Sequence, residues 1–280
     1  FSDYDAVIGP IKEESFDRVA RALKNQRVPV IAAMKKPKSV YSNVFQTVPE
    51  DKLLRKTMID FVKADSLKSK VVIISDHAHR ESSEALKVQF PDSRVIYSIK
   101  KKKDKTKDAF VVPHVALENV FQNGKTIVFL ETNNNSMASS VISMLNGFID
   151  LKTEIVLVTL DKNRAFEGKN IDNNNLSNLK FHYPSVNKDY DDSESNSFIR
   201  AYREEYGVTP SKYVVRGFDI TLDLLMRLAS GDNLYEVSGE TIETEYIENK
   251  FRYNKSLFGG YINEAVYIVK YDNLKIVKAN

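Results

Sequence analysis

Apolar residues recur along the chain in two alternating patterns. Short continuous apolar runs are typical of strands covered on both faces, and apolar residues spaced three or four apart are typical of helices with one buried face. The strand-like runs are residues 5–8, 28–32, 71–74, 94–99, 126–130, 154–160 and 180–183. The helical patterns are residues 13–25, 52–63, 80–89, 113–123, 135–151, 193–206 and 213–230. Strands separated by helices of about 10–15 residues predict right-handed βαβ crossovers and parallel sheets.

Three segments depart from this rhythm. Residues 100–108 contain lysine and aspartate and almost nothing apolar, which predicts a solvated hinge or loop, with a basic contact site for an anionic surface as the alternative. Residues 172–178 are polar and rich in asparagine, which predicts a further loop. Near the end of the chain, the pattern of residues 265–271 predicts an antiparallel strand.

One α/β block on each side of the lysine-rich segment predicts two Rossmann-like lobes joined by a hinge. We expect the first lobe to comprise residues 1–99 and about 211–233, and the second to comprise residues 100–210 and 234–280. Ligands of open α/β sheets bind at the carboxyl ends of the strands, which in a two-lobed protein face one another across a cleft. Residues that follow predicted strand ends are therefore candidates for a ligand site. They are Gly9, Ala33, Met34, Asp76 and His77 from the first lobe, and Glu131, Thr132, Asn133, Asp161 and Arg164 from the second.

Structural roles compete with ligand binding at some of these positions. Asn133 begins a run of three asparagines just before a predicted helix, where an ordinary helix N-cap is the alternative. Met34 has core packing as its alternative role. A cleft with several polar side chains but few charged ones suits a neutral or sugar-like ligand, or none.

The composition narrows the function classes. Of the 280 residues, 42% are hydrophobic, which is enough for large cores. The 41 basic residues nearly balance the 38 acidic ones, so there is no electrostatic case for a nucleic acid partner. Cysteine is absent, which excludes disulfides, zinc–thiolate sites and a cysteine nucleophile. No apolar run approaches the ~20 residues that span a bilayer, so we expect no transmembrane segment. The start at Phe1, without a signal-like region, leads us to expect a mature or truncated product.

No motif indicates catalysis, a cofactor or a metal. His77 and His79 lie on either side of Ala78, just after a predicted strand. Two possible ligands without a third are weak evidence for a metal site, so we interpret both as surface histidines of a loop. The chain contains no glycine-rich phosphate loop and no Gly-x-Ser-x-Gly elbow. The carboxylates occur in no context that singles out a general acid or base. We therefore expect a protein that is not an enzyme and holds no cofactor.

Several stretches, taken in order, resemble a known family. Residues 4–10 (YDAVIGP), 28–31 (VPVI) and 43–49 (NVFQTVP), followed by residues 198–207 (FIRAYREEYG), resemble type I periplasmic binding proteins, the branched-chain amino-acid type receptors of transport systems. The likeness runs over nearly the whole chain. It implies two lobes with parallel sheets and a hinge, a location outside the cytoplasmic membrane, and a small polar ligand delivered to an ABC transporter.

The last part of the chain is similar to a more particular group. Residues 259–271 (GGYINEAVYIVKY) resemble the end of such domains in Bacteroidetes-type envelope proteins, where the domain follows peptidoglycan-binding LysM repeats. The resemblance implies a peptidoglycan-associated protein of the cell envelope, with a cell-wall fragment or an envelope protein as partner. Family members begin with a strand, a helix and a second strand before the segment that opens this chain, so we expect an N-terminally truncated first lobe. Such an incomplete sheet would expose strand edges and permit a dimer.

The expected pocket departs from that of the amino-acid receptors. Residues 32–35 (AAMK) lack the small hydroxyl residues that hold a ligand carboxylate in the family, and residues 75–79 (SDHAH) lack the usual aromatic. Asp219 matches a family position near the ligand amine, with a helix cap or a hinge hydrogen bond as its alternative role. The resemblance thus leaves two main hypotheses: an envelope interaction module, which the missing hydroxyls favour, and a solute receptor. A sugar-binding transcription regulator of the same fold is a third.

Overall fold

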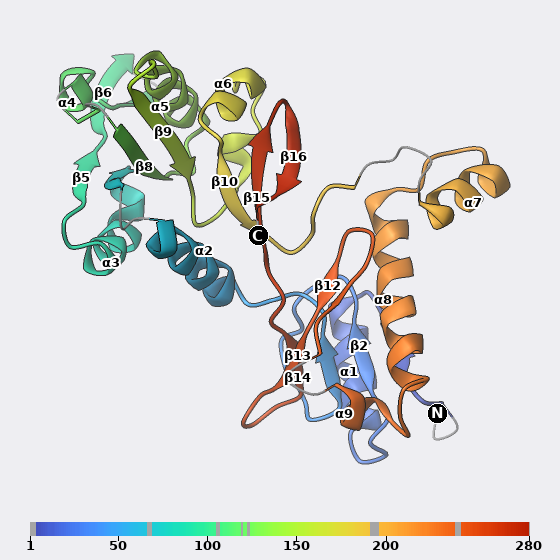
Figure 1. Ribbon diagram of the computed structural model, residues 1–280. Coiled ribbons are helices and arrows are strands. Elements are labelled where there is room, and N and C mark those ends of the chain that lie inside the picture. The colour runs from blue at the N-terminus through green and yellow to red at the C-terminus, as the bar shows by residue number, and fades with distance from the viewer. Residues whose placement is uncertain are drawn as a thin grey trace. The chain divides into compact units, whose positions relative to one another are not determined.

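The described residues of the computed structural model fall into two compact units. Residues 4–65, 69–104, 107–118, 120–121, 124–190, 196–238 and 242–279 are described. The first unit comprises Phe1–Leu53 and Val186–Val266, and the second comprises Leu54–Ser185 and Tyr267–Asn280 (Figure 1). The chain therefore passes between the units after Leu53, Ser185 and Val266.

The first unit is built on a five-stranded sheet. Its strands, in spatial order, are β1 (Val7–Ile8), β2 (Val30–Ala32), β3 (Val44–Gln46), β14 (Tyr261–Asn263) and β13 (Tyr253–Lys255). Neighbours from β1 to β14 are parallel, and β13 is antiparallel to β14.

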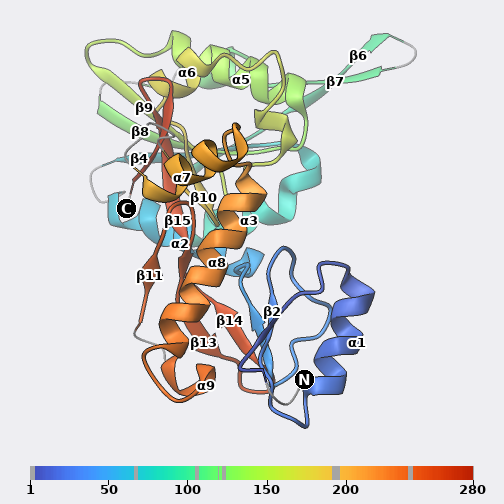
Figure 2. The ribbon, with the colours of Figure 1, turned by 90° about the vertical axis from the view of Figure 1, so that its right-hand side faces the viewer.

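Helices cover both faces of this sheet because successive side chains of a strand point to opposite sides. Val30 and Ala32 pack against α1 (Glu13–Leu23), whereas Ile31 packs on the other side with residues of α8 (Lys212–Leu228). Figure 2 shows α1 and α8 on opposite sides of β2. The unit also contains α7 (Ser197–Tyr206), α9 (Leu234–Val237) and the hairpin of β11 (Thr244–Glu245) and β12 (Lys250–Phe251).

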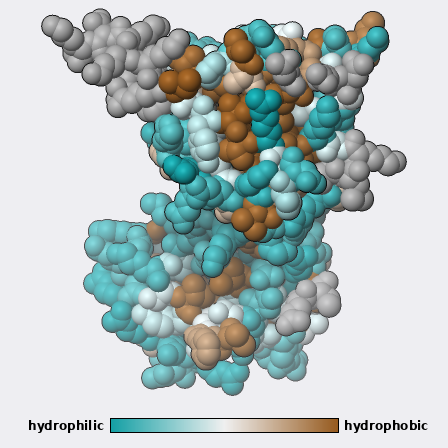
Figure 3. Space-filling model, turned by 90° about the vertical axis from the view of Figure 1, so that its left-hand side faces the viewer, coloured by the Kyte–Doolittle hydropathy of each residue, from teal (hydrophilic) through white to brown (hydrophobic). Residues whose placement is uncertain are grey.

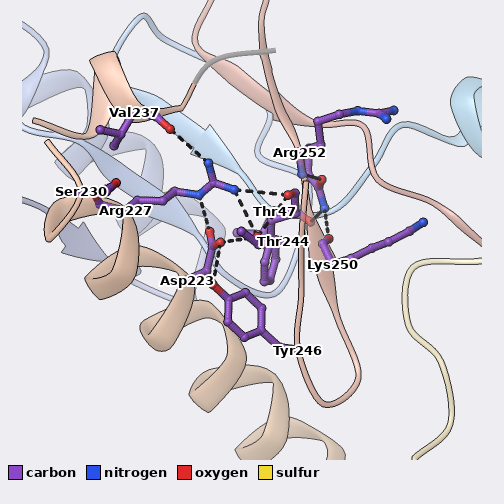
Figure 4. Close-up of polar contacts among 11 residues, drawn as sticks. Thr47, Asp223, Arg227, Ser230, Val237, Thr244, Tyr246, Lys250 and Arg252 are labelled. Carbon is purple, nitrogen blue, oxygen red and sulfur yellow. Dashed lines mark hydrogen bonds and ion pairs between the residues drawn. The ribbon is translucent and has the colours of Figure 1, made fainter. Parts of the chain in front are cut away.

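A buried ion pair ties α8 to the β11–β12 hairpin (Figure 4). Arg227 Nε donates to Asp223 Oδ2 over 2.9 Å, and the two side chains are only 4% and 3% exposed. The other oxygen of Asp223 accepts hydrogen bonds from the hydroxyls of Thr244 (2.6 Å) and Tyr246 (3.2 Å). The guanidinium group also donates to the backbone oxygen of Phe251 (3.2 Å). Because every charged atom of the pair has a partner, this cluster can remain charged inside the unit.

The second unit is built on a seven-stranded sheet. Its strands, in spatial order, are β16 (Lys275–Lys278), β15 (Tyr267–Asp272), β10 (His182–Ser185), β9 (Thr153–Val158), β8 (Gly124–Glu131), β4 (Lys70–Ser75) and β5 (Arg94–Tyr97). Strands β10, β9, β8, β4 and β5 are parallel. Strand β15 is antiparallel to β10 and to β16, which confirms the antiparallel strand predicted over residues 265–271.

The helices of this unit cover both faces of its sheet. On one face, α2 (Asp51–Asp65) and α3 (Arg80–Gln89) pack on a core that includes Ile73 and Phe129. On the other face, a larger core includes Ile74 and Leu130. The helices there are α4 (Val115–Glu118), α5 (Asn135–Gly147) and α6 (Asn173–Asn178). The near-continuous burial of β8 and β9 explains why their sequences read as unbroken apolar runs.

The observed units correct the predicted lobe boundaries. Strands β4 and β8 form a parallel ladder that runs from the pair Lys70 and Thr126 to the pair Ser75 and Glu131. The chain on either side of residue 99 therefore belongs to one sheet, and the passage between the units occurs at Leu53 instead. The predicted hinge over residues 100–108 lies within a hairpin of β6 (Ile99–Asp104) and β7 (Lys107–Val111), whose backbone pairing the lack of apolar residues concealed.

Two other expectations about local structure were wrong. The asparagine-rich segment forms α6, because Asp172 accepts a hydrogen bond from Asn174 N (2.8 Å) as an N-cap and Leu176 is fully buried. The helix predicted over residues 113–123 is the single turn α4 in the described part of this segment.

The predicted helix end at Gly207 is confirmed: its φ is 68° and its N–H donates to Arg203 O over 2.8 Å. Among the described helices, none combines the length and the hydrophobicity that a bilayer span requires.

Candidate functional site

Polar side chains of the second unit gather where three parallel strands end. Asp76 follows β4, Glu131 is the last residue of β8 and precedes Thr132, and Asp161 lies shortly after β9. These strands are neighbours in the sheet, in the order β9, β8, β4. The structure therefore places Asp76 and His77 in the same unit as Glu131 and Thr132, and not in the opposite lobe as predicted, because β4 pairs with β8.

Asp76 links the ends of β4 and β8. Its Oδ2 accepts a hydrogen bond from the Thr132 hydroxyl (2.7 Å), and its Oδ1 accepts from the backbone N–H of His79 (3.1 Å) and lies 2.7 Å from Nδ1 of the same residue. Burial, the largest single effect, raises the pKa of Asp76, but the hydrogen bonds from Thr132 and His79 outweigh it and hold this pKa below its usual value. The carboxylate is thus stabilised in its charged form by groups of its own unit.

Glu131 is the most deeply buried carboxyl at this edge, with 3% of its surface exposed. Its Oε1 accepts from Leu160 N (2.9 Å) and from the Thr159 hydroxyl (3.3 Å), and its Oε2 accepts from the Ser82 hydroxyl (3.2 Å). Burial is the largest effect and raises the pKa of Glu131 above its usual value, although Leu160 and Ser82 act in the opposite direction. Glu131 thereby ties β8 to the loop after β9 and to α3.

The loop residues beside this pair support one another. The Asn163 amide donates to the side chain of Asn133 (2.7 Å) and to the backbone oxygen of Thr132 (3.0 Å). The helix cap before α5 is made by Asn134, whose side chain accepts from Met137 N (2.9 Å). Asp161 and Arg164 are exposed nearby, and Arg164 begins a short 3-10 turn that ends at Phe166.

An aromatic stack lies at the end of β5. The rings of His77 and Tyr97 are stacked, with centroids 5.8 Å apart and planes 7° apart. The Arg80 guanidinium carbon lies 6.0 Å from the centre of the Tyr97 ring. His77 is exposed and Tyr97 is partly exposed, so this stack presents a flat surface beside Asp76.

The predicted residues of the first unit lie at the corresponding edge of its own sheet. Gly9 follows β1 with φ 88°, a value that favours glycine, and its N–H donates to Ile31 O (2.9 Å). Ala33 and Met34 follow β2 and line a cavity of only about 20 Å³. That volume is about enough for one water molecule.

Arg216, which was not among the predicted site residues, hydrogen bonds to the backbone just beyond β2. Its guanidinium donates to the backbone oxygen of Ala33 (2.8 Å), to the Thr47 hydroxyl (3.0 Å) and to the side-chain oxygen of Asn249 (2.6 Å). Burial is the largest effect on its pKa and lowers it from the usual value. Arg216 lies inside the long apolar pattern of α8, and only the fold shows which of its polar residues turn inward.

Asp219 is fully buried on α8. Its carboxylate accepts from the backbone N–H groups of Ile247 (3.2 Å), Glu248 (2.9 Å) and Asn249 (3.0 Å), and from the Asn249 side chain (2.9 Å). These contacts give Asp219 a structural role, as an anchor for the turn between β11 and β12. Ligand binding by Asp219 and by the other residues predicted for the site stays a prediction.

Three residues at the strand ends of the second unit were missed. Tyr97 ends β5, and Thr159 follows β9, so the rule that selected Glu131 would also have selected both. Ser82 carries no such signal, because it lies within α3 and reaches Glu131 only through the packing of that helix.

The chemistry available at these edges is that of hydrogen bonding. Within the described residues, the hydrogen-bond partner of the His79 ring is the carboxylate of Asp76. In the same part of the chain, no group of three histidine or carboxylate side chains is placed to hold a metal ion.

Comparison with known proteins places the fold. No family model matches the chain, and no curated protein is similar to it in sequence. A putative branched-chain amino acid ABC transporter from Rhodospirillum rubrum matches 99% of this chain and 81% of its own, with 11% identity and a TM-score of 0.56. A branched-chain amino acid ABC transporter periplasmic ligand-binding protein from Burkholderia xenovorans matches 99% of this chain and 76% of its own, with 8% identity and a TM-score of 0.55.

The chain therefore has the fold of type I periplasmic binding proteins, as the sequence predicted. Full-length LpoA from Haemophilus influenzae is also similar, with 10% identity and a TM-score of 0.52. The match covers 98% of this chain and 48% of LpoA, so this chain spans about half the length of that protein.

Proposed function

We propose that this chain is a non-catalytic binding domain of a cell-envelope protein, working outside the cytoplasmic membrane as an interaction module and not as an amino-acid receptor. The observation that carries the proposal is that the polar groups at the strand ends are engaged with one another. A receptor of this fold would direct such groups at its ligand.

In the second unit, the carboxylates at the strand ends already have internal donors. Both oxygens of Asp76 and both oxygens of Glu131 accept hydrogen bonds from residues of the same unit. A ligand ammonium group would have to replace these donors. Each buried donor left unpaired costs about 1–3 kcal/mol, which would offset much of the gain from the new contact.

In the first unit, the segment beyond β2 offers no hydroxyl for a ligand carboxylate. Ala33 and Met34 occupy that place, and the cavity of about 20 Å³ beside them is far too small for an amino acid. The guanidinium of Arg216, which hydrogen bonds to the backbone of Ala33, also donates to Thr47 and Asn249 and is engaged inside the unit. In both units, therefore, the polar groups at the strand ends hold the unit together, which favours a domain that has this fold but no amino-acid site.

The location in the envelope, and association with peptidoglycan next to LysM repeats, are supported by the resemblance of residues 259–271 to such proteins. The fold is compatible with that location, since one of the proteins that share it is a periplasmic ligand-binding protein. A cell-wall fragment or an envelope protein is the partner that fits this proposal.

A solute receptor of an ABC transporter is the second candidate. Of the proteins with the same fold, one is a putative branched-chain amino acid ABC transporter and another is the periplasmic ligand-binding protein of such a transporter. The exposed stack of His77 on Tyr97 beside Asp76 offers a surface on which a small polar ligand can lie.

A thermal-shift panel separates the two candidates. The chain is heated with amino acids, sugars or muropeptides at millimolar concentration. A ligand at 100 times its Kd stabilises the fold by about 2.7 kcal/mol, which raises the Tm by several degrees. We expect no shift with any amino acid, whereas a shift with a muropeptide supports the envelope module.

Matched variants make the other outcome decisive. A shift with leucine or another amino acid that is lost in Asp76→Asn and in Glu131→Gln, but kept in a variant of the exposed Lys169, overturns the proposal in favour of the receptor.

A further inference from the structure

We propose that the second unit carries a separate binding site for a small organic anion with an apolar group. The site is a cavity of about 740 Å³ at the amino ends of β4 and β5. Asp76, Glu131 and Thr132 lie at the opposite, carboxyl edge of the same sheet. The inference is therefore independent of the function proposed above.

Segments far apart in the sequence form the wall of this cavity. It is lined by the end of α2, the start of β4, the end of α3 with the turn that follows it, and the start of β5. In Figure 3, which shows the side where β5 and α3 lie, hydrophobic residues of this unit reach the surface among hydrophilic ones. The volume is within the range of about 300–1,000 Å³ typical of small-molecule sites.

The floor of the cavity is apolar. Val72, Phe90 and Val120 line it and are 2%, 7% and 8% exposed. Phe90 is held in place by the ring of Phe129, whose centroid lies 5.4 Å away. A hydrocarbon group placed against this floor is removed from water, which favours its binding.

The rim of the cavity is basic. Lys63, Lys70 and Arg94 line it together with one carboxylate, Asp92. The Lys63 ammonium donates to the side-chain oxygen of Gln89 (2.6 Å). Within the described part of the chain, neither Lys70 nor Arg94 forms an ion pair, and both are exposed. An anionic head group at the rim can pair with two cations that are not paired with any carboxylate of the described residues.

The turn that contains Ser93 forms a further part of the cavity wall. Ser93 lines the cavity, is 4% exposed, and its Oγ has no hydrogen-bond partner among the described residues. The turn around it is held by Lys87, whose ammonium donates to the backbone oxygens of Pro91 (2.6 Å) and Ser93. These contacts fix the turn that forms this part of the cavity wall.

An apolar floor below a cationic rim selects a carboxylate that carries a hydrocarbon or aromatic group. Octanoate is a suitable probe, and octan-1-ol is its neutral counterpart. Isothermal titration calorimetry of the whole 280-residue chain is expected to show octanoate binding about tenfold tighter than octan-1-ol, the usual weight of one well-placed charge contact.

Charge reversal at the rim tests the assignment. Lys70→Glu and Arg94→Glu are each expected to weaken octanoate binding about tenfold and to leave octan-1-ol binding unchanged. Both residues are exposed, so the variants are expected to fold, and circular dichroism checks this. Lys169→Glu, which makes the same charge change at another exposed position of the second unit, is expected to bind octanoate like the wild type.

Three results would overturn the inference: no octanoate binding, equal affinity for octanoate and octan-1-ol, or octanoate affinity that is the same in Lys70→Glu and Arg94→Glu as in the wild type. Asp76→Asn is expected to bind octanoate normally, so failure of this inference and failure of the proposed function are seen in different variants.

Discussion

The buried pair of Asp223 and Arg227 allows a quantitative test of what holds the first unit together. Replacing Asp223 by leucine removes the acceptor of Arg227 Nε and of the Thr244 and Tyr246 hydroxyls, and leaves a cation that is 4% exposed without its counter-charge. Breaking a buried pair from one side costs about 3–5 kcal/mol. We expect a loss of this size in the free energy of unfolding of Asp223→Leu.

The complementary change and the double variant complete a thermodynamic cycle. Arg227→Met leaves the Asp223 carboxylate with the hydroxyls of Thr244 and Tyr246, so we expect a smaller loss of about 2–3 kcal/mol. In the double variant no buried charge remains, and we expect a loss well below the sum of the single losses. The coupling energy should reach about 2–3 kcal/mol.

The chain offers a matched control in the same unit. Asp17 and Arg21 have the same residue types and the same spacing on α1, with a contact of 2.7 Å, but their side chains are 26% and 68% exposed. The same substitutions there should give a coupling far smaller than that of the buried pair, because solvent screens an exposed ion pair.

Urea unfolding followed by tyrosine fluorescence provides the free energies, because the chain has 14 tyrosines and no tryptophan. Hydrogen exchange of the β12 amides assigns the loss to the first unit, since the two units need not unfold together. Single losses below about 1 kcal/mol, or a double variant equal to the sum of the single ones, would refute the reasoning that burial gives this pair its weight.

Three further predictions follow from single side chains. Burial, followed by the charge of Asp219, raises the pKa of Glu248 from 4.5 to about 7, so the folded state holds this proton more tightly and stability falls as the pH rises from 4.5 through 7. Glu248→Gln removes this loss, and Tm curves of the two proteins measured from pH 4 to 8 should therefore diverge; parallel curves contradict the assignment. Thr132→Val removes the hydroxyl that donates to Asp76 and should cost about 1–3 kcal/mol in urea unfolding, whereas Thr132→Ser should cost much less; equal losses would assign the effect to packing. Gly207→Ala places a side chain at φ 68° and should lower stability by about 1 kcal/mol in the same assay, and an unchanged midpoint would show that α7 does not depend on this end.

Much of the local structure was predictable because its causes are local. The limits of α3 match the predicted helix, and Gly207 ends α7 as expected, since apolar spacing and a C-terminal glycine act within a few residues. The meeting of Asp76, Glu131 and Thr132 at one edge of the sheet was also predictable, because each lies at or just after the end of a parallel strand.

The errors have equally physical causes. Short polar segments such as α6 and the β6–β7 hairpin carry almost no apolar pattern, so a cap or backbone pairing decides them. The partners of a strand lie far away in sequence, and nothing in residues 70–75 indicates that they pair with residues 126–131. Because of that pairing, Asp76 belongs to the same unit as Glu131, whereas the prediction had placed the two residues in different lobes.

The amino-acid sequence by itself determined the alternation of strands and helices, the fold class that follows from it, and the absence of any cysteine chemistry, because periodicity and composition are properties of the chain alone. The tertiary structure decided which strands share a sheet and which charges are buried. It also decided which carboxylates accept hydrogen bonds from their own unit. Those outcomes depend on contacts between residues such as Ser82 and Glu131, which lie 49 positions apart, and no local pattern encodes them.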